Sequence, residues 1–257
     1  MQTLSGKTAL ITGVSRQNGI GFAIAERLAE MGINLFLHSY SPYDKQMEQD
    51  VAENELEQIA AALKKYNVSI EQQEADFQDA QATQNIFNNA LKTFEHIDIL
   101  VLNHTYDSLA KLEGLTATEI DRHLAVNVRA ALQLIQLFAK NHDGRPGGRI
   151  IMLTSGQHLG PMPDLAYVAS KGALLQLTSS VSDLLIDTGI TVNTVNPGPV
   201  KTYKVDEKIE RIVLERMPLK RWGEPDDPAR LIAWLVTDEA RWITGQVINS
   251  EGGFRRG

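Results

Sequence analysis

The sequence predicts an α/β domain built on a doubly wound parallel sheet with helices on both faces. Two observations support this fold class. Apolar strand-like runs alternate with helical patterns from one end of the chain to the other, and such alternation is typical of a parallel sheet covered by helices. In addition, 257 residues with 43% hydrophobic content suffice for a single core. We therefore expect residues 1–257 to form one domain.

The first half of the chain is expected to hold four strands and three helices. Short apolar runs predict the strands, whereas apolar positions that recur every three or four residues predict the helices. In chain order these are the strand TALIT, a helix over 20–31, the strand NLFLHS, a helix that begins at about Val51 and runs over 51–66, the strand SIEQQEA, a helix over 80–94 and the strand IDILVLN.

The second half continues the same alternation. Thr116 and Glu119 have the spacing of a capping box and mark the start of a long helix, and Gly189 ends a later helix. The elements are a helix over 118–138, the strand RIIMLT, a helix that carries Tyr167 and Lys171, the strand TVNTVN, an amphipathic helix within 201–221, a helix near 228–237 and the strand QVINS.

Composition excludes several classes of partner and site. Twenty-five basic and 32 acidic residues give a net charge of −7, and the basic residues are dispersed. We therefore expect neither a nucleic-acid nor a membrane partner. The chain has no cysteine, so disulfides and Cys-based metal sites are excluded, and we expect no metal site. Its N-terminus lacks a signal-peptide pattern and no apolar stretch reaches membrane-spanning length, which predicts a cytoplasmic protein.

Tyr167 and Lys171 form the first candidate catalytic pair. They stand four positions apart in AYVASKGALL, so a helix places both side chains on one face. A neighbouring ammonium favours the phenolate and lowers the pKa of the phenol. Ser155 ends the strand RIIMLTS and is expected to hydrogen-bond the reacting oxygen. Taken alone, such a Tyr–Lys pair more often marks a solvated helix face.

A glycine-rich turn raises the weight of this catalytic interpretation. The first strand runs into TGVSRQNGIG, where Gly13, Gly19 and Gly21 allow a tight turn and a close approach of the backbone to a pyrophosphate. The helix N-terminus that follows offers free N–H groups to the same phosphates. An ordinary strand-to-helix turn is the alternative, but the position after the first strand of a βαβ unit favours a nucleotide site.

Together, these motifs resemble in order and spacing the single-domain branch of the short-chain dehydrogenase/reductase family, over essentially the whole chain. The resemblance covers the glycine motif, EADFQD with Asp76 and Phe77, LVLNH around Asn103, a catalytic tetrad, the loop NPGPVKT, and the C-terminal signatures RWGEP and ITGQVINSEGG. It implies a Rossmann-type fold and hydride transfer between a nicotinamide cofactor and a carbonyl or alcohol. The tetrad positions match Asn127, Ser155, Tyr167 and Lys171.

The resemblance also implies a role for each site residue. Tyr167 acts as general acid or base, Lys171 lowers the pKa of the phenol and holds the nicotinamide ribose, and Ser155 stabilises the substrate oxygen. Asn127 holds a water that relays protons to Lys171. The expected cofactor contacts are Gly13, Ser15, Arg16, Gly19, Ile20, Gly21, Ser39, Asp76, Phe77, Asn103, Tyr167, Lys171, Pro197, Gly198, Val200 and Thr202.

The chain departs from the family pattern at three places. Five residues separate Gly13 from Gly19 where the family usually has three, and the residues around Asn103 differ. Twelve positions instead of thirteen separate Ser155 from Tyr167. Thr154 therefore competes for the hydroxyl role, but Ser155 is favoured because loops tolerate a change of length whereas strand register does not.

The second strand suggests which cofactor is used. NAD enzymes of this fold tend to carry a carboxylate at the end of that strand, whereas this strand ends in His38, Ser39 and Tyr40. With Arg16 in the glycine loop to attract a 2′-phosphate, NADP is favoured and NAD is the alternative. Asp44 is expected to lie outside the strand. His38 assists the phosphate or is a polar surface residue.

Three functions remain in view. The first is a carbonyl reductase of the 3-oxoacyl-carrier-protein reductase type, acting on a small ketone or an acyl thioester. The second is an enoyl reductase, a group that shares the longer glycine loop but spaces its tyrosine and lysine seven positions apart. The third is a non-catalytic nucleotide sensor on the same fold.

Two further features follow from the resemblance. The segment 201–221 corresponds to a substrate lid, with a fixed surface helix as the alternative. The apolar stretches AALQLIQLFA and ALLQLTSSVSDLLI correspond to helices that pack against copies of themselves, which predicts a homotetramer or at least a dimer.

Overall fold

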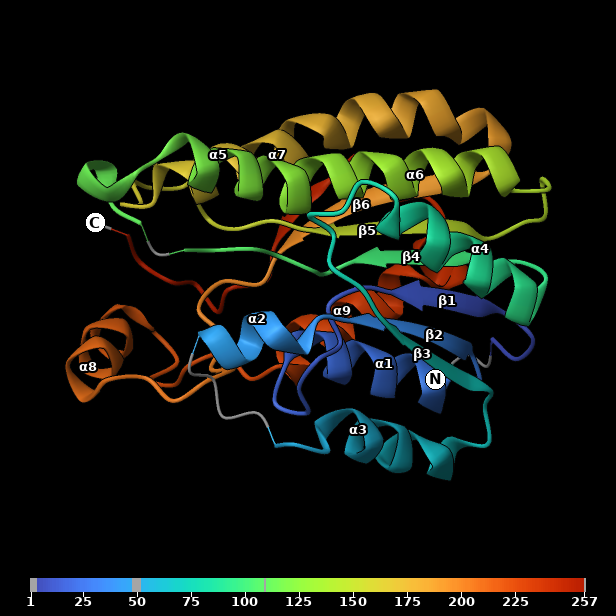
Figure 1. The fold of residues 1–257 in the computed structure, drawn as a ribbon, viewed down its shortest axis with the longest axis horizontal. Helices are drawn as coiled ribbons and strands as arrows, with labels where there is room; N and C mark the ends of the chain where they lie inside the picture. Colours follow the sequence, from blue (N-terminus) through green and yellow to red (C-terminus); the bar gives the residue numbers. More distant parts are fainter. Residues whose placement is uncertain (1–3, 48–51, 109, 257) are drawn as a thin grey trace.

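The computed structural model describes residues 4–47, 52–108 and 110–256. They form a single parallel sheet of seven strands in the order β3-β2-β1-β4-β5-β6-β7 (Figure 1). The predicted doubly wound α/β fold is confirmed. The strands are β1 (Thr8–Ile11), β2 (Asn34–Ser39), β3 (Ile70–Glu74), β4 (Ile99–Leu102), β5 (Gly148–Leu153), β6 (Ile190–Asn196) and β7 (Val247–Asn249).

Helices cover both faces of the sheet (Figure 1). One face packs against α1 (Ile20–Glu30), α3 (Glu55–Leu63) and α9 (Asp226–Leu235), and the other packs against α4 (Ala82–Phe94), α6 (Ala130–Asn141) and α7 (Leu165–Leu185). Because both faces are covered, central strands such as β1, β5 and β6 are buried at every position. The strand order reverses between β1 and β4, and the carboxyl ends of the strands open a crevice at that point.

The predicted long helix contains a π-helical segment. It comprises α5 (Ala117–His123), six π-helical residues (Leu124–Arg129) and α6. Its start is confirmed, because the Thr116 side chain accepts a hydrogen bond from the Glu119 N–H at 3.2 Å. The Glu119 carboxylate does not complete the capping box and instead accepts a bond from the Tyr106 hydroxyl at 2.8 Å.

Two helices differ from the sequence prediction. A short helix, α2 (Ser41–Gln46), follows β2 and was not predicted. Within the charged segment 201–221 the helix α8 occupies only Glu207–Arg216, and the Asp206 side chain caps its N-terminus. Val51, the expected start of the helix over 51–66, lies outside the described residues. In the part of the chain that the structure describes, no helix has the length and apolarity needed to cross a membrane.

Candidate active site

A cleft of about 940 Å³ opens at the carboxyl ends of the central strands. The turn after β1, the ends of β2 and β3, and the loops after β4 and β6 form its walls, and Tyr167 and Lys171 lie in it. The predicted residues that line it are Gly13, Ser15, Arg16, Gly19, Ile20, Asp76, Phe77, Asn103, Tyr167, Lys171, Pro197, Gly198, Val200 and Thr202. The fold therefore brings together motifs that are widely separated in the sequence.

The glycine turn fits a bound pyrophosphate. Gly13 has a φ of 74°, a left-handed conformation that favours glycine. The Asn103 amide donates hydrogen bonds to the Thr12 and Gly13 carbonyls at 3.0 and 2.9 Å and so fixes the turn. Helix α1 starts after Gly19 with no side-chain cap and no acidic residue in its first turn. Its first N–H groups therefore remain available for an anion.

Gly21 has a packing role in this turn and does not line the cleft. A Cβ at Gly21 would lie 2.5 Å from the Gly13 carbonyl oxygen and 2.7 Å from Asn103 Nδ2. Such contacts are far too short for a side chain. Glycine at this position therefore lets α1 approach the turn, and its predicted contact with a cofactor stays a prediction.

Arg16 lies in the cleft but already has a carboxylate partner. Its Nε donates to Asp44 Oδ1 at 2.9 Å, and its Nη1 donates to the Thr202 carbonyl. Asp44 lies outside the second strand, as the sequence predicted, but α2 returns it to the cleft wall, where it is 7% exposed. The second strand therefore ends without a carboxylate, as predicted, but a carboxylate from α2 lines the same cleft and pairs with Arg16.

The end of β2 also differs from the sequence prediction. His38 is buried and stacks on Phe77, with ring centroids 3.9 Å apart. Its Nε2 bonds the Ala75 carbonyl at 2.9 Å, its Nδ1 accepts from the Gly13 N–H at 3.3 Å, and burial lowers its pKa to about 4. His38 is thus a neutral wall residue and neither a surface residue nor a cation for a phosphate. Ser39 is buried outside the cleft lining, because side chains alternate along a strand and His38 takes the cleft side.

Tyr167 lies in the first turn of α7 and lines the cleft. The Asp164 side chain caps this helix, accepting a hydrogen bond from the Tyr167 N–H at 3.0 Å. Burial raises the pKa of the phenol, the negative charge of Asp107 adds to the rise, and hydrogen bonds from the Ser155 and Thr105 hydroxyls oppose it. The phenol is therefore protonated at neutral pH.

Lys171 is buried beside the phenol, and the pKa of the phenol is nevertheless raised. Its Nζ donates to the Leu153 carbonyl at 3.1 Å and lies 5.8 Å from the centroid of the Tyr167 ring. Burial lowers the pKa of Lys171 to about 8. The predicted depression of the phenol pKa by this ammonium is wrong, because desolvation dominates both groups and the ammonium faces the ring and a carbonyl.

The structure distinguishes the two hydroxyls that compete beside Tyr167. Thr154 is buried and its hydroxyl donates to the Lys171 carbonyl at 2.9 Å. The Ser155 hydroxyl donates to Met162 Sδ at 3.7 Å, and Ser155 is near enough to the Tyr167 phenol to oppose the rise of its pKa. This arrangement favours Ser155 for contact with a reacting oxygen, although Ser155 itself does not line the cleft.

Asn127 lies behind the cleft wall, inside the π-helical segment. Its Oδ1 accepts from the Tyr106 N–H at 2.7 Å, and its Nδ2 donates to the Tyr106 carbonyl and the Ser170 hydroxyl, each at 2.9 Å. The side chain thus ties the loop after β4 to α7. Both Nδ2 hydrogens and one lone pair of Oδ1 are thus engaged with the protein, and the predicted water relay stays a prediction.

Sequence reasoning assigned no site role to several residues that line the cleft. His104 is buried between Thr12 Oγ1 at 2.6 Å and the Val126 carbonyl at 3.0 Å, and burial lowers its pKa. Tyr43 from α2 donates from its hydroxyl to the Asp107 carbonyl at 2.9 Å. For His104, its position directly after Asn103 could have indicated a place in the site. The sequence around Tyr43 contains no such indication, because Tyr43 reaches the site through a contact with the distant residue Asp107.

Comparisons with known proteins agree with this geometry. The profile of a family described as "Enoyl-(Acyl carrier protein) reductase" matches residues 13–255. An uncharacterized oxidoreductase, YjdA, from Bacillus subtilis is 40% identical over 98% of both chains. A 3-oxoacyl-[acyl-carrier-protein] reductase, FabG, from Rickettsia conorii is 33% identical over 99% of both.

Solved structures give the same result. A short-chain dehydrogenase/reductase from Serratia marcescens is 32% identical, with a TM-score of 0.86 over 98% of this chain and 99% of the other. A short-chain dehydrogenase from Burkholderia cenocepacia in complex with NADP is also 32% identical, with a TM-score of 0.87 over 98% of this chain and 99% of the other.

Proposed function

This chain belongs to the short-chain dehydrogenase/reductase family, and from that premise we propose that it is an NADP-dependent reductase of carbonyl groups. One observation carries the proposal. A protonated phenol, Tyr167, lies near Ser155 and lines the same cleft as the glycine turn. A proton donor and an anion-binding helix terminus in one cleft are what a carbonyl reductase needs.

Each residue has a definite task in this reaction. The nicotinamide group supplies the hydride. Tyr167 donates its proton to the carbonyl oxygen of the substrate, and its raised pKa keeps that proton in place at neutral pH. Ser155 donates a hydrogen bond to the same oxygen as negative charge develops on it. Lys171 holds the ribose, and Asn127 keeps the wall of the cleft in position through Tyr106 and Ser170.

The 2′-phosphate of NADP is assigned to Arg16. The guanidinium lies at the cleft wall beyond the second strand, which ends without a carboxylate, and a similar structure contains NADP. Guanidinium groups bind phosphates through paired hydrogen bonds. Asp44 would share the guanidinium with the phosphate, so the preference for NADP over NAD is expected to be moderate.

For the substrate we propose a 3-oxoacyl thioester or another small ketone. The similarity to 3-oxoacyl-[acyl-carrier-protein] reductases supports this class. An enoyl reductase is the second candidate, because the matching family description names that activity. The four-residue spacing of Tyr167 and Lys171 favours the carbonyl reductase, since enoyl reductases space the pair seven positions apart.

The lid and the assembly are also proposed. Residues 202–206 line the cleft next to α8, and α8 exposes 51% of Ile209 and 41% of Ile212, which supports a lid that covers an apolar substrate. Leu132 on α6 is 40% exposed and Leu184 on α7 is 76% exposed. These apolar side chains support packing between copies of the chain.

A substrate panel tests the proposed reaction. The purified protein is mixed with NADPH or NADH and with an acetoacetyl thioester, a crotonyl thioester or simple ketones, and oxidation of the nicotinamide is followed by absorbance. We expect turnover of the acetoacetyl thioester or a ketone. Reduction of the crotonyl thioester alone would instead establish an enoyl reductase. Tight NADPH binding with no turnover of any member would support the nucleotide sensor.

A further inference from the structure

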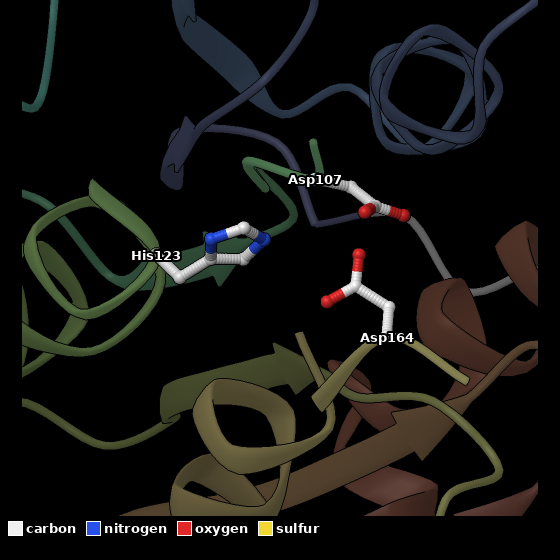
Figure 2. A group of neighbouring side chains, drawn as sticks. All are labelled: Asp107, His123 and Asp164. Carbon is white, nitrogen blue, oxygen red and sulfur yellow. The ribbon is translucent and has the colours of Figure 1, made fainter. Parts of the chain in front are cut away.

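Three side chains from distant parts of the chain converge beside the catalytic helix. Asp107 follows β4, His123 ends α5 and Asp164 caps α7, and each offers one possible ligand atom (Figure 2). These atoms all lie within 4.8 Å of one another. Figure 2 shows the imidazole and the two carboxylates directed toward a common point.

His123 is held in the orientation of a metal ligand. The side chain is fully buried, and its Nδ1 donates to the Glu119 carbonyl at 2.7 Å. This bond places the proton of the neutral ring on Nδ1, so the lone pair of Nε2 faces the carboxylates. Within residues 4–47, 52–108 and 110–256, Nε2 has no hydrogen-bond partner. A histidine that ligates a metal typically donates its other ring N–H to a backbone carbonyl in this way.

Asp164 presents a second buried atom to the same point. Its Oδ1 accepts from the Tyr167 N–H at 3.0 Å, whereas no described residue hydrogen-bonds its Oδ2. The residue is only 7% exposed. A buried carboxylate oxygen without a partner is costly, because folding removes its water without replacement. Two buried atoms of this cluster, His123 Nε2 and Asp164 Oδ2, thus have no hydrogen-bond partner among the described residues and could bind the same ion.

Charge determines what kind of partner fits. Asp107 lines the cleft and brings a second carboxylate to within 4.8 Å of Asp164, and two negative groups at this distance repel each other. A dication neutralises both carboxylates and accepts the lone pair of His123 Nε2. Imidazole with carboxylates is a common ligand set for Zn²⁺, which binds these atoms at about 2.0–2.2 Å. Hard cations such as Mg²⁺ prefer oxygen ligands alone.

We infer that Asp107, His123 and Asp164 form a site for a divalent transition-metal ion, best matched by Zn²⁺. The ion ties together the loop after β4, the end of α5 and the N-terminus of the helix that carries Tyr167. Two ligands of one zinc ion lie about 3–4 Å apart, so a small approach of the three side chains closes the site. This inference departs from the absence of a metal expected from the sequence and does not depend on the proposed reaction.

The test measures metal binding directly. Full-length protein is treated with EDTA, freed of the chelator and titrated with ZnCl₂ by calorimetry, and bound zinc is counted by mass spectrometry after dialysis. We expect one zinc ion per chain and a rise in melting temperature with zinc, because a ligand that binds the folded state stabilises it.

Asp164→Asn is the principal variant, because asparagine caps a helix as well as aspartate and so preserves α7. We expect its zinc affinity to fall at least ~10-fold, with the zinc-dependent rise in melting temperature lost. His123→Asn provides a second variant with the same expected loss. His96→Asn is the matched control, because His96 lies 3.2 Å from Asp98 at another place on the molecule, and it should bind zinc as the unmodified protein does.

Two outcomes would overturn the inference. The first is no stoichiometric zinc binding by the unmodified protein. The second is zinc binding that Asp164→Asn and His123→Asn leave unchanged or that His96→Asn removes, since this would place the ion elsewhere.

Discussion

The Arg16 guanidinium donates from Nε to Asp44 Oδ1 at 2.9 Å, so the cation that faces the cofactor end of the cleft has its own counter-ion. Both side chains are largely buried, with 14% and 10% of their surfaces exposed. The pair is therefore screened less by solvent than an exposed pair. Any phosphate that binds Arg16 must approach a carboxylate as well, so we expect Asp44 to influence the preference between NADPH and NADH.

This relationship predicts opposite effects of two substitutions. Arg16→Ala should raise the KM for NADPH ~10-fold or more and change the KM for NADH little, since a charge-assisted hydrogen bond contributes about 1.5–3 kcal/mol. Asp44→Asn should lower the KM for NADPH, because it removes a repulsive charge and frees the guanidinium. Steady-state kinetics with both cofactors provides the measurement.

Arg27→Ala is the control for these kinetics, because Arg27 forms its ion pair with Asp226 outside the cleft. It should leave both KM values unchanged. A preference of the unmodified protein for NADH would contradict the NADP proposal as a whole. An NADPH preference that Arg16→Ala does not change would contradict only the role of Arg16.

Tyr167→Phe should abolish most of the carbonyl reduction. The ring still packs against Lys171, but the proton donor is lost, and general acid catalysis typically contributes ~10²–10⁴ in rate. NADPH binding, measured by fluorescence titration, should stay within a few-fold of its normal value. Tyr66→Phe is the control, because that hydroxyl bonds Glu26 away from the cleft. Turnover above about a tenth of normal in Tyr167→Phe would exclude this residue as the acid.

The sequence predicted the sheet and most of its helices because their signals are local. The apolar runs and the helical periodicity that predict an element lie within that element. The order of the motifs along the chain predicted that the motifs meet at the carboxyl ends of the strands. The helix α2 was missed because its stability depends on distant partners. Tyr43 bonds the backbone of Asp107, and Asp44 pairs with Arg16, and neither contact leaves a pattern in the segment SPYDKQ.

The sequence predicted which residues line the cleft better than it predicted the pKa values of those residues. Fourteen of the sixteen expected cofactor contacts line the cleft, whereas Gly21 and Ser39 do not, which shows that motif position fixes location. The pKa directions of Tyr167 and Lys171 were not predictable, because they depend on burial by the whole fold. The sequence also did not predict that His123 and Asp164 lie close together, since 41 positions separate them.

Burial of Lys171 predicts an unusual dependence of stability on pH. Its pKa falls from 10.5 to about 8 on folding, so between these values the unfolded chain binds more protons than the folded one. The contribution of this group to the free energy of unfolding therefore rises with pH, by at most about 1.4 kcal/mol per pH unit. Denaturant titrations at pH 8, 9 and 10 should show this rise in the unmodified protein and not in Lys171→Met. Equal pH dependence in the two proteins would contradict the assignment.

Assembly should depend on the apolar surface of α6 and α7. We expect light scattering at micromolar concentration to report a dimer or tetramer of the 28.4 kDa chain. Leu184→Glu places a charge on a side chain that is 76% exposed and should shift the protein toward the monomer, since a buried unpaired charge is costly. Leu112→Glu, at a position that is 65% exposed outside these helices, should leave the mass unchanged. A particle of one chain in the unmodified protein would rule out the assembly.

Ser155 and Thr154 should separate into a catalytic and a structural hydroxyl. Ser155→Ala removes the hydrogen bond to the phenol and to the developing oxyanion, and loss of one such donor typically costs ~10²–10³ in turnover. Thr154→Val preserves shape but loses the 2.9 Å bond to the Lys171 carbonyl, so it should lower the free energy of unfolding by about 1 kcal/mol. Its turnover should remain near normal. Turnover numbers and denaturant midpoints of both variants distinguish the roles, because each substitution should change one quantity and spare the other. If Thr154→Val loses turnover and Ser155→Ala does not, the register of the active site is shifted by one residue and Thr154 carries the reaction.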